Sequence, residues 1–392
     1  MSVKAQTNRV LLALPFAALA ALWGLDFVSV QPNRIMPGTG QSLVAALGWP
    51  GALLLSGGVL AILLNAWRIT SPRFWLTLAL ATLLLALLPL ALHWAAQRHV
   101  PADQPIARIG LGAGFWALVF LLCLMIIEVL QRLRAGTHWR LLVMAVVLGS
   151  LFWFISTGRL DELALLREYQ SRSRQFGTAL RGHLMLVGGA VGVSLVMGFG
   201  LAVQILRRPS WQKPVLGVLS FFQTIPSLAL FGLLIAPLSA LSAQFPWLQQ
   251  FGIRGIGWAP AVLALIGYSL LPMVRNTWVA LDGVPAGVME AARGMGMSPL
   301  QAFVRVRLPL AVPVVLEGVR ITTIQAIGLT AVAALIGAGG FGTFIFQGLG
   351  QAANELILLG AIPTILLALL ADMIFTALAA LTAGYRKEVA TS

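Results

Sequence analysis

Apolar runs of about twenty residues recur along almost the whole sequence, and they limit the chain to a membrane-spanning fold. The composition agrees, because 59% of the residues are hydrophobic and only 10% are charged, against about 25% charged in soluble domains. The first run follows Lys4 and Arg9 as a signal peptide would, but it is long for one and no small-residue cleavage site follows it. We therefore predict an all-α polytopic membrane protein with about ten transmembrane helices. The expected spans are 10–30, 43–67, 74–96, 111–130, 141–157, 184–206, 215–241, 259–281, 312–338 and 356–381.

The net charge of +14 follows from membrane topology, and it does not indicate a nucleic-acid partner. With ten spans and both termini in the cytoplasm, fifteen Lys and Arg residues fall in cytoplasmic segments and four in the outer segments other than residues 158–183. This is the bias that membrane insertion imposes. One outer segment, residues 158–183, breaks the rule because it holds five arginines. We expect contacts with membrane lipids and none with nucleic acid.

The sequence contains few candidates for a metal, cofactor or nucleotide site. Cys123 is the only cysteine, and the four histidines lack metal-ligand spacing, so we expect no metal site and no bound cofactor. The chain has no G-x-x-x-x-G-K-[ST] phosphate loop, so any ATP hydrolysis must come from a partner. The string GAGGFG at 337–342 matches a dinucleotide fingerprint, but a spanning helix precedes it where that fingerprint needs a strand. We interpret its glycines as a helix break and predict an outer gate at Gly337, Gly339, Gly340 and Gly342.

The sequence divides near residues 158–183. Residues 1–157 should form an N-terminal membrane region of about five helices. Residues 158–183 should form an amphipathic connector on the outer face, either a solvated helix or a docking surface for an outside partner. Residues 184–383 should form a core of five helices with a loop at 282–311, followed by a cytoplasmic tail at 384–392.

The stretch EAARGMGMSPLQAFVRVRLP, residues 290–309, is amphipathic where its surroundings are apolar. Gly296 follows a short helical pattern and permits the left-handed turn that would end it. Ser298 then begins the capping-box pattern S-P-L-Q, which predicts the start of a second helix. The sequence thus predicts a helix–turn–helix on the cytoplasmic face, in which Ala291 and Ala292 leave a low surface for another protein to approach.

This stretch resembles the coupling motif of ABC importer permeases: EAA, three residues, Gly, nine residues, an aliphatic residue, one residue, Leu-Pro. Every spacing matches, with Val306 where Ile is commoner. In that family the loop seats in a groove of a cytoplasmic ATPase subunit. The resemblance therefore implies an ATPase-coupling surface formed by Glu290, Ala291, Ala292, Gly296, Ser298, Phe303, Leu308 and Pro309.

Four further strings look like permeases for osmoprotectants such as glycine betaine, choline and carnitine. They are QTIPSLALFGLLI (223–235), YSLLPMVRNT (268–277), LPLAVPVVLEGVR (308–320) and ALIGAGGFG (334–342). The likeness covers roughly residues 160–383, and the first five spans look like a subgroup of bacterial betaine permeases with extended N-termini. It implies a type I ABC importer fold in the C-terminal half and a place in the bacterial inner membrane. The implied partners are ATPase subunits that bind ATP and Mg, an external substrate-binding protein, and a second permease copy or paralogue.

Ionisable residues inside predicted spans are costly and need partners. Arg275, Glu317, Arg320 and Asp372 all fall in the cytoplasmic halves of the last three spans. We predict a charge network among them, which either ties these helices together or lines the inner end of a substrate path.

Two other functions remain open at this point. One is an ABC permease for another small solute such as an amino acid. The other is a transporter driven by an ion gradient, which would use an intramembrane carboxylate such as Glu128 or Asp372 but would not need the insert at 290–309. Quaternary ammonium is usually recognised by an aromatic cage, and in such systems the external binding protein holds it, so the permease sequence leaves the substrate open.

Overall fold

The computed structural model describes residues 9–34, 36, 38–67, 70–100 and 106–391, with side chains placed except at Thr137 and 383–391. The chain forms two compact units, Met1–Ser171 and Arg172–Ser392. The division falls inside the segment that we predicted to be a separate connector, residues 158–183.

The first unit is a bundle of apolar helices. Its interior is made of alanines and branched aliphatic side chains, among them the fully buried Leu22, Val59, Leu118 and Met125. The predicted first span is shorter than the apolar run suggested, because its helix ends at Gly24 and the chain continues as a strand. The helices are α1 (Arg9–Gly24), α2 (Leu43–Asn65), α3 (Ser71–His99), α4 (Ala113–Arg132), α5 (Thr137–Ser156) and α6 (Ala164–Ser171).

A small antiparallel sheet, which the sequence analysis did not predict, lies at one end of these helices. It consists of β1 (Val28–Gln31), β2 (Thr39–Gln41) and β3 (Arg108–Leu111), in the order β2-β1-β3. Val28 lies opposite Gln41 on one side and opposite Leu111 on the other. The fold is otherwise helical, as predicted.

Helix α6 is tied to this sheet by an ion-pair cluster. The buried carboxylate of Glu168 accepts hydrogen bonds from Arg34 at 2.8 Å and from Arg108 at 3.1 Å. A buried carboxylate needs such cationic partners to offset its lost hydration. The first part of the predicted connector therefore belongs to the first unit.

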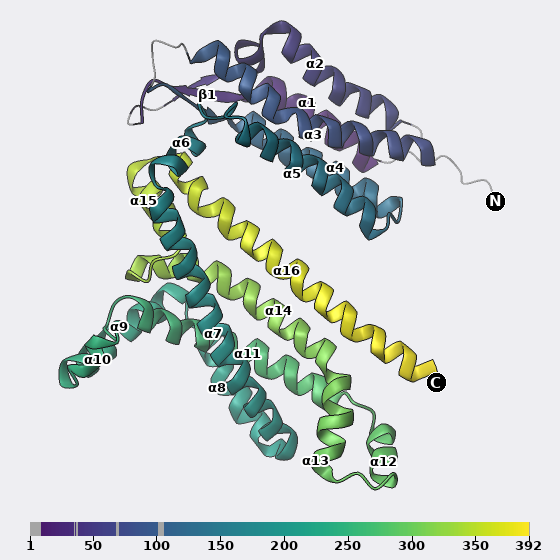
Figure 1. The fold of residues 1–392 in the computed structure, drawn as a ribbon, viewed down its shortest axis with the longest axis vertical. Coiled ribbons are helices and arrows are strands. Elements are labelled where there is room, and N and C mark those ends of the chain that lie inside the picture. Colours follow the sequence, from purple (N-terminus) through teal and green to yellow (C-terminus); the bar gives the residue numbers. More distant parts are fainter. Residues whose placement is uncertain (1–8, 35, 37, 68–69, 101–105, 392) are drawn as a thin grey trace. The chain divides into compact units, whose positions relative to one another are not determined.

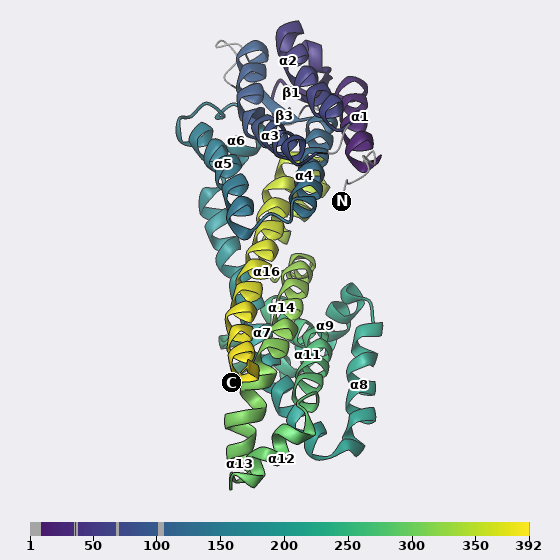
Figure 2. The same ribbon diagram turned by 90° about the vertical axis from the view of Figure 1, so that its right-hand side faces the viewer.

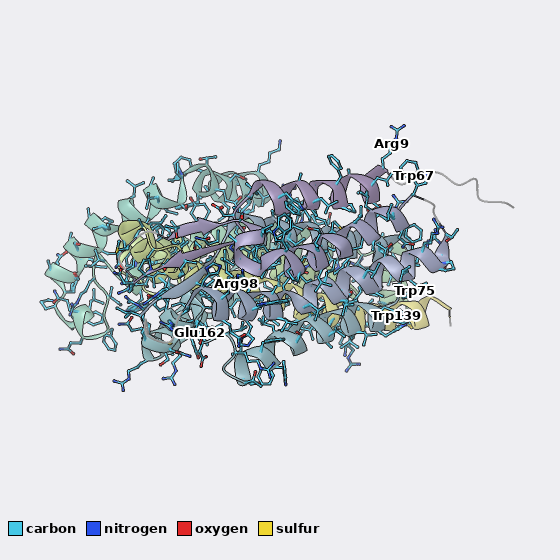
Figure 3. All side chains as sticks on the ribbon, turned by 90° about the horizontal axis from the view of Figure 1, so that it is seen from above. Arg9, Trp67, Trp75, Arg98, Trp139 and Glu162 are labelled. Carbon is cyan, nitrogen blue, oxygen red and sulfur yellow. The ribbon has the colours of Figure 1, made fainter. Side chains whose placement is uncertain are left out.

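Tryptophans lie toward both ends of the first unit, and three of them are at the end away from the sheet. Trp67, Trp75 and Trp139 lie toward the end where α1 begins, whereas Arg98 lies toward the other end (Figure 3). The ring centroids of Trp75 and Trp139 are 4.4 Å apart. Tryptophan at the ends of spanning helices is typical of the lipid headgroup level, so these residues mark one membrane interface.

The second unit is built around α7 (Ser173–Arg207), α11 (Trp258–Asp282), α14 (Leu308–Ala333) and α16 (Asn354–Thr391). Helices α14 and α16 run side by side (Figure 2). The shorter elements are η1 (Pro209–Trp211), α8 (Gln212–Thr224), α9 (Ser227–Gln244), α10 (Trp247–Gln250), α12 (Ala286–Gly294), α13 (Pro299–Ala302), η2 (Phe303–Arg307), η3 (Ala334–Ile336) and α15 (Gly342–Gln351). In the described part of the chain, nine helices are long and apolar enough to cross a membrane, and α1 is a shorter apolar helix.

Helix α7 is continuous across the predicted boundary between connector and core at residue 183. It runs for 35 residues from Ser173, so residues 173–183 belong to a spanning helix and not to a separate interfacial helix. Toward the other terminus, α16 continues without interruption to Thr391 and includes most of the predicted tail at 384–392. Ser392 lies outside the described residues.

The predicted span 215–241 is two helices. Helix α8 ends at Thr224, α9 begins at Ser227, and α9 departs from the direction of α8 (Figure 1). Pro226 lacks the N–H that would continue the ladder, and it biases Ile225 to the extended backbone that it adopts, with φ −73° and ψ 128°. The predicted span is therefore interrupted near its middle.

Helices α13 and α14 are joined without a break. Between them lies one π-helical turn, η2, in which the N–H of Leu308 bonds the carbonyl of Phe303. The wider turn accommodates Pro309, whose ring would crowd the carbonyl four residues earlier in a regular α-helix. As a result, Pro299–Ile336 forms one helical segment of 38 residues.

Candidate functional site

The insert between α11 and α14 is a helix–turn–helix at one end of the second unit (Figure 2). Helix α12 ends in a Schellman motif: Met297 N–H donates to the carbonyl of Ala292 at 3.2 Å, and Gly296 N–H donates to that of Arg293 at 2.9 Å. Gly296 has φ +79°, the left-handed conformation that this motif requires. The turn thus has a physical reason for glycine at this position.

The second arm starts with a complete capping box. Ser298 Oγ accepts from the N–H of Gln301 at 3.3 Å, and Gln301 Oε1 accepts from the N–H of Ser298 at 2.9 Å. These two bonds satisfy amide groups that the first turn of a helix leaves free. The first arm has no side-chain cap: Asp282 is the last residue of α11, and Pro285 takes the N-cap position of α12.

A small core holds the two arms together. Val284, Met289, Ala292 and Ala302 are buried against one another. Ala292 is 1% exposed, so only Ala291 of the predicted low surface is available to another protein. The role predicted for Ala292 changes accordingly, because its small side chain lets α13 pack against α12.

The tip of the insert presents apolar side chains that the sequence analysis did not single out. Met295 is 70% exposed and Leu300 is 68% exposed, and Val288 and Val304 are also exposed. Clustered apolar exposure on a polar surface is typical of a protein interface. A signal was present in the sequence, since Met295 directly precedes the turn-forming Gly296 and Leu300 lies two residues after the helix-capping Ser298.

The base of the insert is anchored in the helix bundle. Phe303 and Leu308 are partly buried and pack with Leu281 and Ala311, at the junction of α11 and α14. Glu290 and Pro309 are exposed. The predicted coupling residues therefore divide into an exposed group at the tip and a packed group that fixes the insert to the spanning helices.

The predicted gate is a glycine loop between η3 and α15. Gly337, Gly339 and Gly340 have φ of +77°, +82° and +76°, which any other residue adopts at a cost. Gly342 differs, because its φ is not in the left-handed region and a Cβ there would lie 1.8 Å from the carbonyl oxygen of Ala331. Three of these glycines are needed for backbone conformation and the fourth for close approach.

A buried histidine, one of the four without metal-ligand spacing, holds this loop in place. The ring of His183 in α7 bonds the carbonyl of Ile327 in α14 through Nε2 at 3.2 Å. Its Nδ1 accepts from the N–H of Phe341 at 3.4 Å. Together these contacts assign the neutral tautomer with hydrogen on Nε2. Phe341 is also buried, with its ring centroid 5.4 Å from that of His183 and 5.1 Å from that of Phe176.

An open cavity of about 480 Å³ lies beside the glycine loop. One wall is the start of α7, with Arg172, Arg174 and Gln175, and the other is the loop with Gln347 of α15. The cavity is therefore lined by polar and charged residues at the start of α7, and by the glycine loop with Thr343, Phe344 and Gln347 on the other side.

Three of the four residues of the predicted charge network meet. Arg320 Nε donates to Asp372 Oδ1 at 2.7 Å, and Arg320 also contacts both oxygens of Glu317 at 3.0 and 3.1 Å. The pair with Asp372 links α14 to α16. Arg320 lies near the middle of α14, which is closer to mid-membrane than we predicted.

Arg275 does not join this cluster. It is exposed on α11, and within the described part of the chain it makes no ion pair. Asn276, the next residue, faces α14 instead, where a Cβ on Gly318 would lie 2.7 Å from its Cβ. The helical rotation of about 100° per residue turns Arg275 away from the α14 interface.

Comparison with protein families gives two matches. Residues 194–383 match the family described as binding-protein-dependent transport system inner membrane component. Residues 7–166 match the N-terminal domain of the ABC transporter permease YehY.

Among the described residues, no three His, Cys, Asp or Glu side chains lie together as a metal site requires.

Among solved structures, the chain resembles the MetNI methionine ABC transporter in an inward-facing conformation. The TM-score is 0.46 and the identity 21%, and the likeness covers 54% of this chain and 97% of the other. A second similar structure is an amino acid ABC transporter with histidines, with a TM-score of 0.42 and 20% identity, covering 55% of this chain and 95% of the other.

Three curated relatives match about half of this chain. The osmoprotectant import permease protein OsmW of Salmonella typhimurium is 43% identical over 190 residues, which cover 48% of this chain and 83% of OsmW. The carnitine transport permease protein OpuCB of Listeria monocytogenes is 37% identical over 190 residues, 48% of this chain and 80% of OpuCB. The choline transport system permease protein OpuBB of Bacillus subtilis is 34% identical over 192 residues, 49% of this chain and 81% of OpuBB. Because the chain covers at least 80% of each of these relatives at 34–43% identity, and its residues 194–383 match the family model, it belongs to the family of binding-protein-dependent ABC transporter permeases.

Proposed function

We propose that this permease imports a quaternary-amine osmoprotectant, such as glycine betaine, choline or carnitine, from an external binding protein into the cytoplasm. The observation that carries the proposal is the exposed helix–turn–helix at 286–302 in a chain 43% identical to an osmoprotectant import permease. Relatives named for carnitine and choline support the same substrate class.

The insert is the proposed seat for an ATPase subunit. Its tip offers Met295 and Leu300 as apolar anchors, with Glu290 at the rim. Its base is fixed to α11 and α14 through Phe303 and Leu308. A push or pull from ATP-driven closure of the ATPase pair therefore reaches the spanning helices directly. The complete transporter contains two permease chains, either identical or paralogous, two ATPase subunits and the binding protein.

The ion-gradient alternative has less support. It needs a carboxylate that is free to bind an ion or proton in mid-membrane. Of the two candidates, Glu128 pairs with Arg132 at 2.5 Å and Asp372 pairs with Arg320 at 2.7 Å. Neither carboxylate is therefore free of a cationic partner, as an ion-binding site in mid-membrane would require.

Reconstitution tests the proposal. The permease, its ATPase subunits and the binding protein would be placed in proteoliposomes, and uptake of labelled glycine betaine, choline and carnitine measured with and without ATP. We expect ATP-dependent uptake that survives collapse of ion gradients by ionophores. Uptake of an amino acid in preference to all three would replace the substrate assignment, and loss of uptake on adding ionophores would favour the ion-gradient alternative.

The proposed orientation places both termini and residues 282–311 in the cytoplasm of a bacterial inner membrane and residues 158–171 outside. Single cysteines at Ser171 and Ser298, introduced after replacing Cys123, report it through labelling by an impermeant thiol reagent. We expect Ser171→Cys to react from outside and Ser298→Cys only after the membrane is opened. Labelling of both from the same side would show that the number of spans between them is even and that the orientation is wrong.

A further inference from the structure

The break between α8 and α9 lies at mid-membrane depth. Ile225 at the break is in hydrogen-bond contact with Tyr268, whose hydroxyl donates to the Ile225 carbonyl. Tyr268 lies near the middle of α11, a candidate spanning helix of 25 residues. Irregular backbone at this depth is tolerated where it is buried in protein or lines a water-filled path.

A second bond runs in the opposite direction and has a clear cause. Pro272 in α11 lacks the N–H that would bond the carbonyl of Tyr268. Gln223 supplies the missing donor, with its Nε2 at 3.0 Å from that carbonyl oxygen. Two hydrogen bonds, from the Tyr268 hydroxyl to the Ile225 carbonyl and from Gln223 to the carbonyl that Pro272 leaves free, therefore hold the break in a fixed position against α11.

Other backbone groups at the break stay open. The carbonyl of Phe222 would bond the N–H of residue 226, which is a proline. Within the described residues, the carbonyls of Phe222, Gln223 and Thr224 receive no backbone or side-chain donor. Thr224 itself donates to the carbonyl of Phe221 at 2.7 Å. These groups cannot face lipid unsatisfied, and a hydrated path along this side of the break would satisfy them.

The chemistry of this surface suits an organic cation. The C-terminal end of a helix carries a partial negative charge from its free carbonyls. Phe221, on the last turn of α8, is 63% exposed and offers an aromatic ring directly before them in the sequence. Residues 214–253 contain no charged side chain, so nothing here would hold a cation tightly or repel it. Aromatic faces and carbonyl dipoles are the groups that bind quaternary ammonium, which has no hydrogen to donate.

We propose that the α8–α9 break is a transient binding station for the quaternary ammonium group of the substrate as it crosses the membrane. The station consists of the Phe221 ring and the carbonyls of Phe222, Gln223 and Thr224, held in place by Tyr268. This inference rests on the proposed osmoprotectant import and adds where the permease itself contacts the cargo. Weak contacts fit the role, because a station on a path must release what it binds.

Cysteine protection tests binding without relying on transport. Thr224→Cys would be made in a full-length permease whose native Cys123 is replaced by serine, assembled with its ATPase subunits in proteoliposomes. The rate of modification by a small thiol reagent would be measured with tetramethylammonium or with tert-butanol, a neutral molecule of similar shape. We expect tetramethylammonium, and not tert-butanol, to slow the modification. Equal rates with both would overturn the station.

A ring substitution tests the role in transport. Phe221→Leu should lower turnover roughly fivefold, the size expected of one cation–π contact at a partly exposed site. Stimulation of the ATPase by liganded binding protein should persist, so more ATP is spent per substrate imported. Phe221→Tyr should restore turnover, and Phe251→Leu, which changes a phenylalanine of similar exposure at 66%, should have no effect. Wild-type turnover in Phe221→Leu would reject the station, whereas a wild-type protein that imports no quaternary amine would reject the proposed function instead.

Discussion

Replacing Gly296 should weaken the ATPase seat without disturbing any spanning helix. Its φ of +79° completes the Schellman motif at the end of α12, and a Cβ there would meet no atom within 4 Å. The cost of a substitution is therefore backbone strain and not a clash within the chain. An L-residue pays about 1 kcal/mol for the left-handed conformation, which corresponds to roughly fivefold in an equilibrium constant.

The side chain chosen at position 296 should set the size of the effect. Gly296→Asn should be mildest, because asparagine tolerates the left-handed region better than most residues. Gly296→Ala should weaken ATPase binding about fivefold. Gly296→Asp should weaken it further, since it adds a negative charge at the C-terminal end of α12, where the helix dipole is already negative. Glu290→Ala, at the rim, should have less effect than Gly296→Asp because single rim contacts contribute little.

The assay is titration of the purified ATPase subunit onto the permease in nanodiscs, with substrate uptake measured in parallel. Gly294→Asp is the matched control, because it adds the same charge two residues away where the backbone is ordinary helix and the space is open. The permease with Gly294→Asp should bind the ATPase more tightly than the permease with Gly296→Asp. If Gly296→Asp holds the ATPase and transports as the unchanged protein does, the insert is not the coupling element.

Three further predictions concern the gate, the charge cluster and the insert tip. Gly340→Val should reduce transport more than Gly339→Val, because a Cβ at residue 340 would lie 3.1 Å from Nδ1 of the buried His183, whereas the space beside residue 339 is open. Uptake measured at equal membrane levels of the two variants checks this, and equal losses would contradict it. Arg320→Gln should lower transport, and a second substitution, Asp372→Asn, should recover part of the loss because it removes the carboxylate that has lost its cation. A double-mutant cycle of uptake rates checks this, and additive losses from the two substitutions would contradict it. Met295→Glu should weaken ATPase binding about tenfold in the same nanodisc titration, because a buried apolar anchor becomes a charge, and unchanged binding would show that the tip is not the contact surface.

The spanning helices were predictable because their apolar runs are long enough to identify by length alone. The break in the seventh span was not. Pro226 is visible in the sequence, but Pro15, Pro272 and Pro363 lie inside helices that continue past them. What distinguishes Pro226 is a tertiary contact, the hydroxyl of Tyr268 on the carbonyl of the preceding residue.

The strands escaped prediction for a different reason. Each has only three or four residues, and β1 follows directly on the apolar run of α1, so hydrophobic periodicity cannot separate strand from helix. Within the functional site, local rules succeeded: the capping box at Ser298 and the left-handed Gly296 depend on neighbouring residues. His183 was missed because both partners of its ring, Ile327 and Phe341, are more than 140 positions away along the chain.

The uninterrupted helix from Pro299 to Ile336 directly connects the insert at its first end to the glycine loop that follows its last residue. Its 38 residues span about 57 Å at 1.5 Å per residue, and a tilt of about 10° around the middle would move each end by about 5 Å in opposite directions. The ion pairs of Arg320 lie near the middle of this helical segment, where the displacement is smallest. One rotation would thus shift the proposed ATPase seat and pull on the loop that His183 holds to α7, so that both ends of this helix move together without a relay of side chains between them.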